Sequence, residues 1–130
     1  MLSLLMHAPD LFNESVRRLG FPDNYDLFLE YTVRPPKGRG KASHTDVMLR
    51  SGTHALGIEG KWTEPMYETV ARWLKGGKDQ ANRATVLEGW LTLLQRRTTK
   101  PLQAEDFHPT IYQMVHRAAP VATAEVPSLD

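Results

Sequence analysis

The sequence spaces two carboxylates and one amine in a way that suits the hydrolysis of a phosphate ester. These groups belong to Asp46, Glu59 and Lys61. Alternate side chains of a strand point to one face, so we expect Glu59 and Lys61 to lie together. Asp46 falls on the preceding strand and is expected to face the same point. Two carboxylates bind Mg²⁺, or Mn²⁺ in its place, and the ion retains several waters. A lysine two residues beyond the glutamate can orient a metal-activated water or stabilise developing negative charge.

These residues are positioned by a predicted β-hairpin formed by 44–50 and 53–62, with a turn at Ser51-Gly52. Ile58, Gly60 and Trp62 point away from Glu59, and this apolar flank favours an internal strand. Charged side chains on an internal strand are costly unless they are paired or coordinate a cation. Repulsion between the two carboxylates further predicts that Glu59→Gln leaves the fold intact or stabilises it without metal.

Hydrophobic periodicity and the positions of glycine and proline predict the elements around the hairpin. Their order is one helix, three strands and then helices, in a single α+β domain spanning residues 1–130. The tail 120–130 is expected to be either disordered or an edge strand at 121–126. The remaining expected elements are a helix at 10–19, a strand at 25–33, a mobile basic loop at 34–41, and helices at 65–75, 82–97 and 110–118.

Composition suits one globular domain, since 41% of the 130 residues are hydrophobic and 24% are charged. Sixteen basic and fifteen acidic residues give a net charge of +1, which neither supports nor excludes a nucleic-acid partner. The chain has no cysteine, which excludes disulfides, thiolate zinc sites and cysteine nucleophiles. No apolar run approaches the roughly 20 residues of a membrane helix, so we expect a cytoplasmic protein with no membrane partner.

Asp46 followed by a turn and by Glu59-Gly60-Lys61 resembles the motif of the PD-(D/E)XK nuclease superfamily, which has the restriction-endonuclease-like fold. The resemblance covers residues 10–118. It implies a three-layer domain with an αβββα-type core, in which a small mixed sheet is flanked by helices. It also implies Asp46 and Glu59 as metal ligands and Lys61 as a catalytic residue. The family's core closes with a fourth strand, for which only 121–126 is available.

Two further segments are similar to a bacterial subgroup of that superfamily. Residues 59–65 resemble its Glu-x-Lys-aromatic-x-Glu run before a helix, and residues 111–117 resemble a late helix. Glu14 on the first helix matches the family's additional acid, although a helix residue facing solvent is the alternative. Glu64 is interpreted as a helix-capping residue. Trp73 and Trp90 lie on apolar stripes and are predicted to be core residues.

Several basic and amide side chains are candidates for contact with a phosphate backbone, because such contacts dominate affinity for nucleic acids. The alternative for each is an ordinary solvated surface. His44 and His54 flank the hairpin without a third ligand at zinc spacing and are interpreted as surface residues. The candidate phosphate contacts are Arg34, Lys37, Arg39, Lys41, Gln113 and Arg117.

The leading expectation is a metal-dependent endonuclease that hydrolyses DNA phosphodiester bonds through an activated water. One alternative is a nuclease-fold binding or regulatory module without turnover. Another is a subunit whose site is completed by a partner, and an exposed sheet edge would also allow a homodimer. Convergence of the Asp46 and Glu59 carboxylates near Lys61 distinguishes the enzyme from the module.

Overall fold

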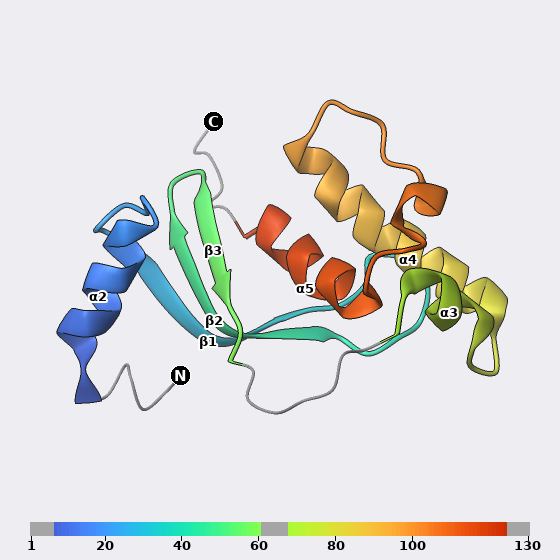
Figure 1. Ribbon diagram of the computed structural model, residues 1–130, viewed down its shortest axis with the longest axis horizontal. Helices are drawn as coiled ribbons and strands as arrows, with labels where there is room; N and C mark the ends of the chain where they lie inside the picture. The colour runs from blue at the N-terminus through green and yellow to red at the C-terminus, as the bar shows by residue number, and fades with distance from the viewer. Residues whose placement is uncertain (1–6, 61–67, 125–130) are drawn as a thin grey trace.

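The computed structural model describes residues 7–60 and 68–124 (Figure 1). A first helix is followed by three strands and then by the remaining helices, which confirms the predicted order and the α+β class. No helix in the described segments is both long and apolar enough to cross a membrane. The elements are α2 (Pro9–Arg18), β1 (Asp26–Val33), β2 (Ser43–Ser51), β3 (His54–Ile58), α3 (Val70–Lys75), α4 (Gln80–Leu94), the 3₁₀ turns η1 (Gln95–Arg97) and η2 (Ala104–Phe107), and α5 (Tyr112–Ala122).

The strands pair in the order β1-β2-β3, and both pairings are antiparallel. The predicted mixed sheet is therefore wrong for the described residues. The chain reverses direction in the loop 34–42 between β1 and β2 and in the turn 52–53 between β2 and β3. β2 is the central strand, whereas β3 pairs with β2 alone and ends at Ile58, four residues before the predicted end. The prediction that the Glu59 strand is internal is wrong within this sheet.

Helix α2 covers one face of the hairpin, while α5 lies on its other side (Figure 1). Phe12 and Val16 are four residues apart, so they share one side of α2 and pack against Val47 and Leu49 of β2. The helix ends before Gly20, whose φ of +81° is readily adopted only by glycine. Burial of this apolar stripe fixes α2 to the hairpin.

The larger core lies among α3, α4 and α5, where Trp90 is fully buried together with Val70 and Leu87. The Trp90 indole Nε1 donates to the Tyr112 hydroxyl at 3.1 Å. Tyr112 in turn stacks on Trp73, with ring centroids 3.7 Å apart. The predicted core roles of Trp73 and Trp90 are confirmed, with Trp73 partly buried beside the cluster.

The loop between β1 and β2, predicted to be mobile, is tied to α4. The Arg39 backbone N–H donates to Asn82 Oδ1 at 2.7 Å, and Asn82 Nδ2 donates back to the Arg39 carbonyl at 2.5 Å. Lys37 pairs with Glu88 at 2.8 Å. Gly38 has a φ of +75°, and a Cβ there would lie 2.8 Å from Val86 Cγ2. Two prolines and two glycines thus produce a close-packed turn, because α4 supplies the surface on which they fit.

Helix α5 continues to Ala122, beyond its predicted end at residue 118. The edge strand predicted at 121–126 is wrong at Val121 and Ala122, which are helical, and residues 125 and 126 lie outside the described residues. Pro120 lies inside the helix and has no N–H for the His116 carbonyl. The Ser43 hydroxyl donates to that carbonyl at 2.8 Å, so β2 supplies the hydrogen bond that the helix lacks.

Truncation of the central tryptophan tests the helical core. Trp90→Ala removes a fully buried indole and its hydrogen bond to Tyr112, so we expect a loss of about 3–5 kcal/mol in the free energy of unfolding. Denaturant unfolding measures this loss. Leu19→Ala is the matched control, because Leu19 is 71% exposed and should change stability little. Equal unfolding midpoints for Trp90→Ala and wild type would contradict the core assignment.

The second test concerns His116, which stacks on Tyr112 and meets the edge of Trp90. Burial, with a smaller contribution from the positive charge of Arg117, lowers the pKa of His116 to about 4. Between pH 6.5 and about pH 4, His116 binds a proton in the unfolded chain but not in the folded chain. The free energy of unfolding therefore falls as the pH falls through this range. We expect this loss to be roughly 1–2 kcal/mol after allowance for partial solvent exposure. Unfolding measured at neutral and mildly acidic pH should show a smaller loss for His116→Gln, and an unchanged loss would rule out this origin.

Candidate functional site

The backbones of Asp46 and Glu59 lie opposite each other just beyond the end of β3. Val47 pairs with Ile58, so the same register continued by one residue places Asp46 opposite Glu59. Asp46 is exposed, and its Oδ2 accepts a hydrogen bond of 2.8 Å from the backbone N–H of Gly60. The Asp46 carboxylate therefore contacts the backbone next to Glu59.

The exposure of Asp46 follows from a change in the direction of β2. Strict alternation would place Thr45 on the same face as Val47, but Val47 packs towards α2 whereas Thr45 lies beside Gly57 on the α5 side. Asp46 falls between them, opposite Glu30, where regular pairing of β1 with β2 is interrupted. Glu30 has a φ of +52°, which twists the backbone there. Asp46 is consequently turned outward between buried neighbours.

Glu59 faces α5, where its carboxylate meets Arg117. Glu59 Oε1 lies 3.6 Å from Arg117 Nε, and the two side chains are only 22% and 27% exposed. Arg117 Nη1 also donates to the His44 carbonyl at 2.6 Å and to the Ser43 hydroxyl at 3.3 Å. The guanidinium is thus fixed by β2 while it neutralises Glu59.

A cavity of about 320 Å³ opens beside this pair. Thr45, Gln113 and Arg117 line it together with Glu59. α5 lies very close to β3 at this point, since a Cβ on Gly57 would be 2.6 Å from Val121 Cγ2. Of the predicted phosphate contacts, Gln113 and Arg117 are therefore the two that the fold brings to Glu59.

The remaining predicted residues are either outside the described segments or away from the hairpin end. Lys61 and Glu64 fall outside the described residues. Glu14 forms an exposed ion pair with Arg18 at 2.9 Å on α2, whose apolar side packs against the hairpin. Arg34 is exposed at the end of β1. The part of the chain that the structure describes holds no group of three or more acidic or histidine side chains placed to bind a metal.

Arg39 and Lys41 line a second hollow of about 420 Å³ together with Arg83 of α4. Arg83 is not among the phosphate contacts predicted from the sequence. One signal for it existed, because the helical spacing of Asn82 and Val86 in a predicted helix places Arg83 near the same side. Its partner, the loop at 39–41, becomes a neighbour only when the chain folds.

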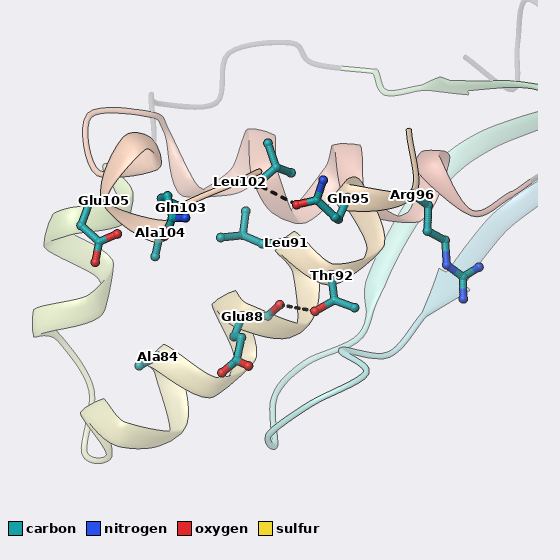
Figure 2. Close-up of a pocket in the computed structure, with 10 residues that line it drawn as sticks. All are labelled: Ala84, Glu88, Leu91, Thr92, Gln95, Arg96, Leu102, Gln103, Ala104 and Glu105. Atoms are coloured by element: carbon teal, nitrogen blue, oxygen red, sulfur yellow. Dashed lines mark hydrogen bonds between the residues drawn. The ribbon is translucent and has the colours of Figure 1, made fainter. Parts of the chain in front are cut away.

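A hollow of about 610 Å³ lies along α4 and the segment before α5 (Figure 2). Two of its polar side chains bond within the protein: the Thr92 hydroxyl donates to the Glu88 carbonyl at 2.9 Å, and Gln95 Oε1 accepts from the Leu102 N–H at 3.0 Å. Figure 2 shows these groups spread along the groove rather than aimed at one point. The groove is therefore a weaker candidate for a catalytic or metal-binding site than the hairpin end.

The donor set at the hairpin end suits Mg²⁺ better than a cation that needs many protein ligands. Mg²⁺ is commonly bound through one or two carboxylates and keeps several waters. Asp46 and Glu59 provide two carboxylates on adjacent backbone positions, and Asp46 is open to solvent. Ca²⁺ takes 6–8 oxygen ligands. The described residues provide no such cluster.

The described residues form a small α+β protein with a three-stranded antiparallel sheet, in which Asp46 and Glu59 lie at the end of the hairpin. The chain belongs to the family described as Domain of unknown function (DUF6946), whose model matches residues 7–126. No curated protein and no solved structure matches the chain significantly.

Glu59→Gln tests whether the ion pair with Arg117 or repulsion from Asp46 dominates at Glu59. The ion pair favours the opposite outcome to the one expected from repulsion, because the substitution leaves the half-buried Arg117 without its charged partner. We expect a loss of about 1–3 kcal/mol in the metal-free protein, measured by denaturant unfolding. Glu14→Gln is the control, since its ion pair with Arg18 is exposed. Stabilisation by Glu59→Gln would show that carboxylate repulsion dominates.

Proposed function

We propose that the chain is a metal-dependent phosphodiesterase of the restriction-endonuclease-like type, acting on DNA. The observation that carries this proposal is the hydrogen bond from the Gly60 N–H to Asp46, which joins one carboxylate to the backbone beside the other. The order of helix, hairpin and helices supports it, as does the position of Lys61 two residues beyond Glu59. The finer assignment to that nuclease fold is part of the proposal.

Each residue has a distinct role in this proposal. Asp46 and Glu59 hold Mg²⁺ or Mn²⁺, which when bound lowers the pKa of a water and polarises a phosphate. Lys61 orients the attacking water and stabilises the charge that develops on the phosphate. Arg117 positions Glu59 through its contacts with the start of β2. Gln113 lies in the same cavity, where its amide can donate to a phosphate oxygen.

One observation favours a second candidate, a binding module of the same fold without turnover. Arg117 already places a positive charge beside Glu59. A divalent cation at Glu59 must share the carboxylate with that guanidinium, which weakens cation binding through like-charge repulsion. The two candidates differ in whether the carboxylate pair binds a divalent cation at all.

Cleavage of DNA by the purified chain tests the enzyme. We expect nicking of plasmid DNA with Mg²⁺ or Mn²⁺ and none with a chelator. Asp46→Ala should lose both metal binding and cleavage, whereas Lys61→Ala should lose cleavage and largely keep metal binding, because lysine acts on water and charge. Calorimetric titration with Mn²⁺ and a gel assay measure the two properties. Glu14→Gln is the matched control and should resemble the wild type.

The outcomes separate the two candidates. Cleavage that survives both Asp46→Ala and Lys61→Ala would exclude this site as its source. A wild-type chain that neither binds Mn²⁺ nor cleaves DNA would favour the binding module. Metal binding lost in Asp46→Ala, together with cleavage lost in Lys61→Ala, is the pattern that the enzyme requires.

A further inference from the structure

The hollow between the β1–β2 loop, α4 and α5 has an unbalanced charge. Arg39, Lys41 and Arg83 line it, and none of the described residues of its lining carries a carboxylate. Asp79 lies outside it and reaches Arg39 only at 3.8 Å, with the Arg39 side chain 89% exposed. Among the described residues, Lys41 and Arg83 form no ion pair. The hollow is therefore a concave basic surface formed by four segments distant in sequence.

Arg83 is held in this hollow by uncharged groups. Its Nη1 donates to the Trp73 carbonyl at 2.6 Å, and its guanidinium lies over the Trp73 ring at 4.9 Å. The lack of a side chain at Gly77 leaves room for the Arg83 guanidinium, because a Cβ there would lie 2.6 Å from Arg83 Nε. A half-buried cation without a counter-charge is costly, and an anion in the hollow would relieve that cost. A guanidinium carries five N–H donors, so most remain for such an anion.

The rim of the hollow is preorganised. Asn82 exchanges two hydrogen bonds with the backbone of Arg39, so its amide fixes the loop. Gly40 packs on Val86, since a Cβ there would lie 3.6 Å from Val86 Cγ2. The backbone that carries Arg39 and Lys41 is consequently fixed against α4. A fixed backbone lowers the conformational entropy that is lost when the two side chains bind an anion.

The aromatic rings that line the hollow are occupied by contacts within the protein, so we expect the hollow to bind a phosphate group and not to stack on a nucleic-acid base. Trp73 is already in contact with Tyr112 through ring stacking and with Arg83 through its guanidinium. Tyr112 is in turn stacked with His116 at 5.7 Å. Burial keeps His116 neutral near pH 7, so the positive charge comes from the arginines and the lysine. Guanidinium groups match phosphate oxygens in a bidentate geometry.

We propose that this hollow is a binding site for a phosphate monoester, with Arg83 as the anchoring cation and Arg39 and Lys41 at the rim. A volume of about 420 Å³ lies within the size range of small-molecule sites and exceeds the need of one phosphate group. A monoester carries up to two negative charges at neutral pH, which suits three cations better than a single diester charge does. The phosphate is that of a free nucleotide or of a nucleic-acid end. The site is independent of the proposed hydrolysis.

Binding without divalent metal tests the site. The full chain is titrated in chelator with inorganic phosphate and with a nucleoside monophosphate, and thermal unfolding is compared with sodium chloride of equal ionic strength. We expect phosphate to raise the melting temperature of the wild type more than chloride does. Arg83→Gln should weaken binding by about tenfold or more, and Arg83→Lys by less. Arg96→Gln is the matched control, since it removes one exposed positive charge near the end of α4 and should bind as the wild type does.

A variant at the rim separates binding from folding. Lys41 is exposed and forms no ion pair among the described residues, so Lys41→Gln should unfold as the wild type does and bind phosphate about threefold or more weakly. Two results would overturn the site: no stabilisation of the wild type by phosphate beyond that of chloride, or equal binding by Lys41→Gln, Arg83→Gln and Arg96→Gln.

The source of the phosphate is resolved with short single-stranded DNA ending in either a phosphate or a hydroxyl. Stronger binding of the phosphorylated strand than of the nucleoside monophosphate, lost in Arg83→Gln, identifies a nucleic-acid end. Equal binding of those two probes identifies the nucleotide. If the hydroxyl-ended strand binds as tightly as the phosphorylated one and depends equally on Arg83, the monoester assignment is wrong and the site reads the diester backbone.

Discussion

The guanidinium of Arg117 connects the helical layer to the hairpin. It donates to the His44 carbonyl and the Ser43 hydroxyl at the start of β2, and it neutralises Glu59 just beyond β3. The same turn of α5 is fixed by the Ser43 hydroxyl, which satisfies the His116 carbonyl left free by Pro120. Because both interactions meet at Ser43, the orientation of Glu59 depends on how α5 is seated on the sheet.

Small residues make this seating possible. Gly57 allows Val121 of α5 to approach β3, and Gly89 allows the backbone of Lys37 to approach α4, since a Cβ there would lie 2.9 Å from the Lys37 nitrogen. The sheet and the β1–β2 loop thus lie directly against two helices. The close approach brings half-buried charges into contact with backbone carbonyls, which have partial negative charge and orient the arginines.

The carboxylate pair and the basic hollow lie around the same helix. Gln113 and Arg117 of α5 line the cavity at Glu59, while Tyr112 and His116 line the hollow of Arg83. Adjacent residues of a helix point about a quarter-turn apart, so the two sites are neighbours without sharing side chains. A chain that binds a phosphate in one and a divalent cation in the other would hold opposite charges on two sides of α5.

Local patterns were sufficient to predict the element order, the hairpin and the core tryptophans, because alternation, helical period and turn residues are properties of short segments. They placed the end of β3 too late and allowed an edge strand at 121–126, since a short apolar run suits helix and strand alike. The mixed sheet, which the family resemblance implied, is antiparallel in the described residues. Three features depend on contacts between distant segments: the partner of Glu59, the loop held by Asn82 and the half-buried cation of Arg83. Only the tertiary structure decided these, because the cost of a buried charge depends on which distant groups surround it.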